Sequence, residues 1–194
     1  MRHSSRQIIL DEHNALSAML QSMLLMISRG PGDDAARFFE VLRAMLFYID
    51  EFPERQHHPK ESDLLFPRLV LLAPDTLDVV VQLEAEHAAG EFRVRELQHL
   101  LLAWEMLGDG RRADFEEAAR RYVGFYLDHM RTEETVILPV AERVLEESDW
   151  RALDAAFACN VDPLAGTGPR DPVYDALFSR ILMRTPAPIG LGDS

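Results

Sequence analysis

Apolar residues recur every three or four positions along four long stretches of the chain, which is the spacing of an amphipathic helix. In the first stretch, Ile9, Leu16, Leu20 and Ile27 lie on one stripe, and the run stops at an Arg-Gly-Pro-Gly breaker. We place the four helices at about residues 5–28, 33–72, 75–107 and 112–147.

These helices predict an all-α protein, because no stretch alternates apolar and polar residues as a half-buried strand does. Short connections make consecutive helices antiparallel, so residues 1–148 are expected to form an up-down-up-down four-helix bundle. Pro53 and Pro59 predict kinks in the second helix. Residues 149–194 form a C-terminal tail, which we expect to contain two short helices joined by a loop at 161–170 and to pack on the bundle.

Two segments of the chain repeat each other, which indicates a duplicated pair of helices. The stretches "HHPKESDLLFP" and "HMRTEETVILP" both read His-x-x-x-Glu, with a proline ten residues after the histidine. The repeat pairs His57 with His129 and Glu61 with Glu133. The first and third helices share an acidic residue followed by histidine, at His13 and His87.

Side chains four residues apart lie on one face of a helix, so each His-x-x-x-Glu pair points one way. Since mid-helix positions of an antiparallel bundle lie at the same height, six polar side chains should converge on the bundle axis. Buried together without a partner, each would cost about 1–3 kcal/mol. Imidazole with carboxylate is a ligand set for transition metals. The predicted ligands are His13, His57, Glu61, His87, His129 and Glu133.

Four histidines and two carboxylates exceed what one tetrahedral zinc needs, and they fit two octahedral ions. Each ion would take two histidines, and each glutamate could bridge both ions. The positions left over would hold a bridging oxide or hydroxide and a small outside ligand. Ligand type alone does not fix the metal, so zinc or manganese stays an alternative.

The neighbours of the predicted ligands are given other roles. His58 aligns with Met130 and should point about 100° away from His57 around an α-helix. Glu12 and Glu86 each precede a histidine and should face solvent or a neighbouring helix. A ferritin-type site, which needs Glu-x-x-His on alternate helices, is rejected because that spacing is not repeated.

The order and spacing of these motifs resemble those of the bacterial hemerythrin-like HHE cation-binding domains. The motifs are, in chain order, His13, His57-x-x-x-Glu61 followed by Leu-Phe-Pro, Glu-His87, and His129-x-x-x-Glu133 followed by Leu-Pro. The resemblance covers about residues 5–148. It implies a four-helix bundle with a non-haem di-iron centre, four histidines on iron and two bridging glutamates. The oxygen carriers of that family place a second histidine one turn along the third helix, where this chain has Glu91.

The resemblance implies a protein that binds a small ligand such as oxygen or nitric oxide at an open iron position. The alternative is a di-iron enzyme that removes peroxide or nitric oxide or repairs iron centres, with an external electron donor. A net charge of −13 argues against nucleic-acid binding, since phosphate contacts need a basic face. The single cysteine and the lack of a long apolar run are typical of a cytoplasmic protein without a membrane span.

Overall fold

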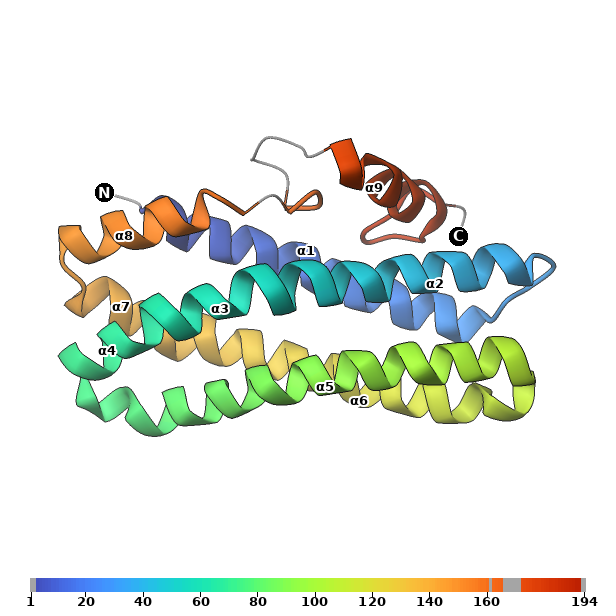
Figure 1. Cartoon of the computed structure of the whole chain (residues 1–194), viewed down its shortest axis with the longest axis horizontal. Coiled ribbons are helices and arrows are strands. Elements are labelled where there is room, and N and C mark those ends of the chain that lie inside the picture. Colours follow the sequence, from blue (N-terminus) through green and yellow to red (C-terminus); the bar gives the residue numbers. More distant parts are fainter. Residues whose placement is uncertain (1–2, 161, 166–171, 193–194) are drawn as a thin grey trace.

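The helices that the apolar spacing predicts are present in the structure, a computed structural model that describes residues 3–160, 162–165 and 172–192. Within those residues every regular element is helical, so the all-α prediction is confirmed. Four long helical segments lie side by side and run in alternating directions (Figure 1). None of the described helices has both the length and the apolar character that a membrane crossing requires.

The first segment is α1 (Ser4–Arg29), which ends at Gly30, where a φ of 76° favours glycine. The second segment consists of α2 (Ala35–Ile49), the π-helical η1 (Asp50–His57), α3 (His58–Lys60), the π-helical η2 (Glu61–Leu65) and α4 (Phe66–Leu72). The third consists of η3 (Pro74–Thr76) and α5 (Leu77–Leu107). The fourth consists of η4 (Asp109–Arg111), α6 (Arg112–Thr132), the π-helical η5 (Glu133–Ile137) and α7 (Leu138–Val144).

The backbone repeats along with the sequence. The π-helical segments η2 and η5 each begin at the glutamate of a His-x-x-x-Glu pair and end two residues before a proline, Pro67 or Pro139. A proline has no backbone N–H, so the carbonyl four residues before it loses its α-helical partner. The wider π turn therefore occurs at the same place in both halves. The kinks predicted at Pro53 and Pro59 take the form of η1, which contains Pro53.

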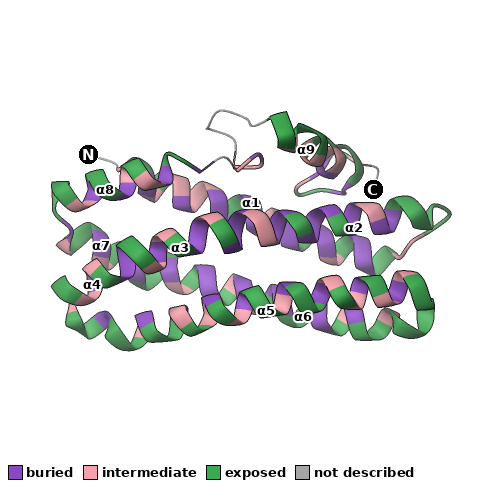
Figure 2. Cartoon of the chain, viewed as in Figure 1, coloured by how far each residue is buried: buried purple, intermediate pink, exposed green. Residues whose placement is uncertain are grey.

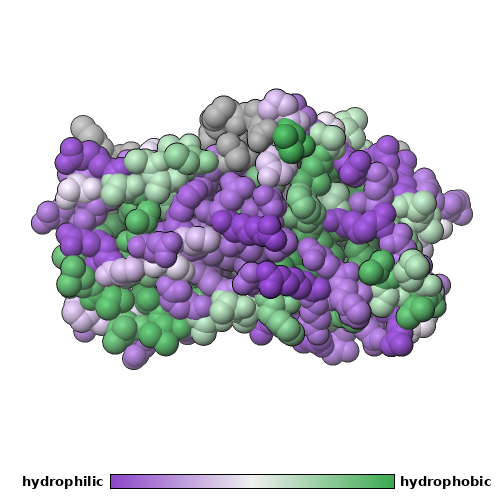
Figure 3. Space-filling view, in the orientation of Figure 1, coloured by the Kyte–Doolittle hydropathy of each residue, from purple (hydrophilic) through white to green (hydrophobic). Residues whose placement is uncertain are grey.

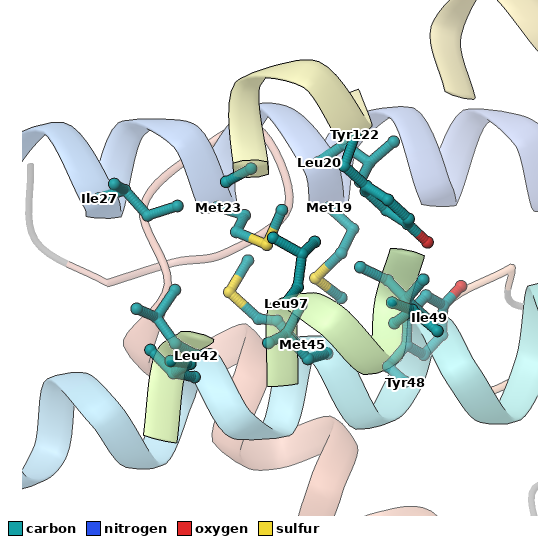
Figure 4. Close-up of a cluster of buried hydrophobic side chains, with 14 of the residues drawn as sticks. Met19, Leu20, Met23, Ile27, Leu42, Met45, Tyr48, Ile49, Leu97 and Tyr122 are labelled. Carbon is teal, nitrogen blue, oxygen red and sulfur yellow. The ribbon is translucent and has the colours of Figure 1, made fainter. Parts of the chain in front are cut away.

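Two apolar clusters fill the bundle, one at each end. The larger joins α1, α2, α5 and α6, and Figure 4 shows Met19, Met45, Leu97 and Tyr122 converging from those four helices. The smaller joins the start of α1 and α5 to α4, α7 and α8. The predicted ligands come from all four segments and are buried between the two clusters. In Figure 2 the buried positions lie along the sides of the helices that face one another. The expectation that the predicted ligands share one height is thus confirmed.

The tail contains α8 (Glu147–Phe157) and α9 (Pro172–Arg184). Asp154 of α8 accepts hydrogen bonds from the backbone and side chain of Ser5 on α1. Ile181 of α9 is buried in the larger cluster, so α9 packs on the bundle as expected. Of the loop expected at 161–170, residues 163–165 form a turn, residue 162 has no regular structure, and the others lie outside the described residues. The domain boundary at residue 148 stays a prediction.

On the face that Figure 3 shows, hydrophilic residues cover much of the surface, in keeping with the acidic composition. Hydrophobic side chains gather at the end of the bundle where α4 turns into α5, and exposed residues there include Leu71, Leu77 and Val81.

Candidate metal centre

The six predicted ligands lie together in one buried layer, with a seventh residue that the sequence reasoning set aside. Their nitrogen and oxygen atoms form two groups, and within each group the atoms lie within 4.8 Å of one another. The first group is His13, His57, Glu61 and Glu133, and the second is His58, His87 and His129. All seven side chains are buried.

The two glutamates lie between the groups. Glu133 has Oε2 3.3 Å from His13 Nε2 and Oε1 3.2 Å from His129 Nε2. Glu61 has Oε1 3.2 Å from His57 Nε2 and Oε2 3.5 Å from His87 Nε2. Each carboxylate thus turns one oxygen toward each histidine group, which is the arrangement that a carboxylate bridging two ions needs.

The expectation that His58 points away from the side that His57 faces is wrong. His58 is buried, its ring stacks on that of His87 with 4.1 Å between centroids, and it lies in the three-histidine group. The 100° step that we used holds for an α-helix, whereas residues 50–57 are π-helical. Because a π turn is wider, successive residues are separated by a smaller angle, and His57 and His58 both reach the interior. The histidines therefore divide as two and three, and not as two and two.

Every histidine of the two groups has its Nδ1 within hydrogen-bond distance of an outer side chain. On the first group the partners are Glu134, 3.0 Å from His13, and Glu12, 2.6 Å from His57. The three partners on the second group are Glu54 for His58 at 3.2 Å, Ser62 for His87 at 3.0 Å and Glu86 for His129 at 2.9 Å. An Nδ1 held in this way fixes the ring and leaves Nε2 to face the centre, as second-shell partners of metal-bound histidines do.

Glu12 and Glu86 were expected to face solvent or a neighbouring helix. The structure places both against a histidine of a neighbouring segment, so they support the site from outside. The repeated acidic-His step in the first and third helices was the sequence signal for this role, since it puts a carboxylate next to each lone histidine. Glu54 lies outside the seven-residue layer, where it also accepts a hydrogen bond from the Tyr126 hydroxyl.

The histidines and carboxylates of the buried layer shift one another's pKa values strongly. Burial lowers the pKa of His129, but Glu133 and Glu86 outweigh burial and raise it to about 9. Burial alone would raise the pKa of Glu133, yet His129 and His13 hold it well below its usual range. Burial and the neighbouring His87 hold the pKa of His58 well below its usual value, so this ring is neutral and able to act as a ligand.

Several buried atoms of this layer still lack a hydrogen bond. Both oxygens of Glu61, both oxygens of Glu133, and Nε2 of His87 and His129 make none to any residue that the structure describes. Unsatisfied buried polar atoms each cost about 1–3 kcal/mol. Imidazole nitrogens and carboxylate oxygens aimed at one place fit a pair of transition-metal ions, which would satisfy these atoms.

A small cavity lies beside the two-histidine group. It is lined by His13, His57 and His58, by the apolar side chains of Leu16, Phe52, Pro53 and Met130, and by the polar residues Glu12, Gln56, Asn160 and Asp162. Its volume is about 10 Å³, which is about enough for one water-sized molecule. The cavity therefore gives a very small ligand a place next to His13 and His57.

Comparison with known proteins agrees with this geometry. A search of curated proteins found no match. The family model described as the hemerythrin HHE cation-binding domain matches residues 4–141, a span that includes both groups of candidate ligands. The chain belongs to the hemerythrin HHE cation-binding domain family.

Proposed function

We propose that this protein holds two iron ions, bridged by Glu61 and Glu133, and binds a small ligand such as oxygen or nitric oxide at one of them. The observation that carries the proposal is the unequal division of the histidines around two carboxylates that face both groups. Imidazole and carboxylate ligands suit iron without excluding zinc or manganese. Membership of the hemerythrin family favours iron, and elemental analysis separates the three metals.

The division decides which ion is open. If each glutamate gave one oxygen to each ion, an ion held by His58, His87 and His129 would have five protein ligands, and an ion held by His13 and His57 would have four. An octahedral ion beside His13 therefore keeps more room for an outside ligand. The small cavity lies on this side, which supports the same conclusion.

An open iron position supplies a site at which a diatomic molecule or peroxide can bind and exchange electrons. The residues around this position orient the histidines and shape the cavity. Glu12 and Glu134 hold the rings of His57 and His13 in place through Nδ1. Leu16, Phe52 and Met130 line the cavity and restrict bulk water, and its size excludes large substrates.

Catalytic reduction of peroxide is the second candidate function, and a cluster of tyrosines beside Glu54 favours it. The hydroxyls of Tyr126 and Tyr122 both donate hydrogen bonds to Glu54. Glu54 also lies within hydrogen-bond distance of His58 Nδ1. Oxidisable phenols beside a metal ligand could supply electrons to a centre that reduces peroxide, with an external donor to restore them.

Rapid mixing of the reduced, iron-loaded protein with oxygen, followed by its absorbance, tests the proposal. A ligand-binding protein gives a lasting oxygenated spectrum with about one oxygen taken up per chain. An enzyme consumes oxygen or peroxide repeatedly as long as a reductant is supplied. A spectrum that does not change on mixing would contradict both candidates.

A further inference from the structure

The cavity beside His13 and His57 is completed by residues from outside the family-matched part of the chain. The match ends at residue 141, whereas Asn160 and Asp162 follow α8 in the tail. Both line the cavity. The part of the wall they supply is therefore a feature of this chain that membership of the family does not imply.

Asn160 is joined to the metal centre through Glu12. Its Nδ2 donates to Glu12 Oε1 at 2.8 Å and to Oε2 at 3.0 Å, and Glu12 Oε2 lies 2.6 Å from His57 Nδ1. Asn160 is only 8% exposed, so these bonds are shielded from water. A carboxylate only accepts hydrogen bonds, so the amide nitrogen must face Glu12 and the amide oxygen must face elsewhere.

The amide oxygen of Asn160 has no hydrogen-bond partner among the described residues, which is unusual for a buried atom. Asn160 Oδ1 is buried and makes no hydrogen bond with any part of the chain that the structure covers. A buried acceptor without a donor is unfavourable, and native proteins rarely keep one without a reason. Since Asn160 lines the cavity and its nitrogen is engaged, Oδ1 is the polar atom it can offer to a molecule held there.

Asp162 fixes the segment that carries Asn160. Its Oδ2 accepts from the Tyr48 hydroxyl at 2.7 Å, and its Oδ1 accepts from the backbone N–H of Leu164 at 2.8 Å. Tyr48 is fully buried in α2. The position of the cavity wall is thus set by the bundle core and not by the surface.

We propose that Asn160 positions and selects the bound ligand by accepting a hydrogen bond through Oδ1, which favours small ligands that carry a hydrogen, such as hydroperoxide, over anions that carry none, such as azide. This inference rests on the proposed function, because it needs a ligand at the open position beside His13 and His57. A lone pair facing the cavity attracts a hydrogen and repels an anion that has only lone pairs to present.

The test compares two probes on the full-length, iron-loaded protein. Hydrogen peroxide and azide are titrated into the oxidised protein, and the dissociation constant of each is obtained from the absorbance. In Asn160→Ala, loss of the hydrogen bond should weaken hydroperoxide binding about fivefold, while azide binds as tightly as before or more tightly. Asn160→Leu keeps about the same side-chain volume. It should change the ratio of the hydroperoxide to the azide dissociation constant in the same direction.

Arg180→Ala is the matched control. It removes a contact of the tail with Glu40, 2.9 Å away on α2, and leaves the cavity lining intact. Its ratio of dissociation constants should equal that of the unchanged protein. Equal weakening of both probes in the Asn160 variants, or no change in either, overturns the inference. So does loss of iron in both Asn160 variants, which would assign Asn160 a structural role through Glu12. Failure of the unchanged protein to bind either probe contradicts the proposed function itself.

Discussion

The ring of His58 lies flat against the ring of His87, with 4.1 Å between the centroids and 11° between the planes. The contact joins a residue next to the π-helical η1 to the middle of α5, and together with His129 it makes the three-histidine group. His58 is therefore part of the same buried layer as the six predicted ligands.

Changing His58 to alanine should remove a ligand from the three-histidine group and leave the other group intact. We expect the variant to retain about one metal ion per chain, measured by elemental analysis after purification. His99→Ala is the control, because His99 is exposed on the same helix as His87. Retention of the parent metal content by His58→Ala would contradict the role assigned to His58.

Glu12→Gln should weaken metal binding without abolishing it. The carboxylate holds His57 through Nδ1, and loss of such a second-shell partner typically costs about 10–100-fold in metal affinity. Competition with a chelator measures the effect, and Glu117→Gln, on the exposed face of α6, should match the parent. An unchanged affinity for Glu12→Gln would show that the outer carboxylate does not support the metal.

Removing the metal should make the free energy of unfolding fall as the pH rises above neutrality. The folded-state pKa of His129 is about 9, above the ordinary 6.5, and the pKa values of His13 and His57 are also raised. A histidine with a raised folded pKa stabilises the fold fully below its unfolded pKa, and this contribution is lost as the pH rises through the folded value.

The free energy of unfolding of the chelated protein, measured with urea, should therefore fall between about pH 6.5 and about pH 9. The metal-loaded protein should change less, because its ligands are already deprotonated. Equal stability of the chelated protein at both ends of this range would show that the histidines are not charged in the metal-free fold.

Two helical glycines should respond oppositely to alanine. A Cβ at Gly90 would collide with the Tyr126 hydroxyl and lie 2.9 Å from Glu54 Oε1, whereas a Cβ at Gly124 meets nothing within 4 Å. Gly90→Ala should destabilise by about 1–3 kcal/mol through overpacking. Gly124→Ala should stabilise by about 0.5–1 kcal/mol, since alanine is the better helix former. Thermal unfolding measures both, and a stabilised Gly90→Ala would contradict the packing around Glu54.

The helices and the six repeated candidate ligands could be predicted from the sequence because both follow from spacing. An amphipathic stripe needs only the α-helical period, and the pairing of His57 with His129 needs only the repeat. These features are local or periodic, so they can be read without knowing how the chain folds.

His58 and Asn160 could not be found in that way. The position of His58 depends on a π turn, and the prolines at 53 and 59 signal a distortion there without giving its type. Asn160 reaches Glu12 from 148 positions along the chain, and its segment is held by Tyr48 through Asp162. Such contacts depend on how the tail packs, which no periodicity encodes.

The central claim is that two metal ions lie side by side, bridged by Glu61 and Glu133. Anomalous X-ray diffraction from crystals of the iron-loaded protein, collected at the iron absorption edge, tests it most directly. We predict two peaks within the buried layer, one beside His13 and His57 and the other among His58, His87 and His129, with both glutamates between them. A single peak, or none in that layer, would contradict the account.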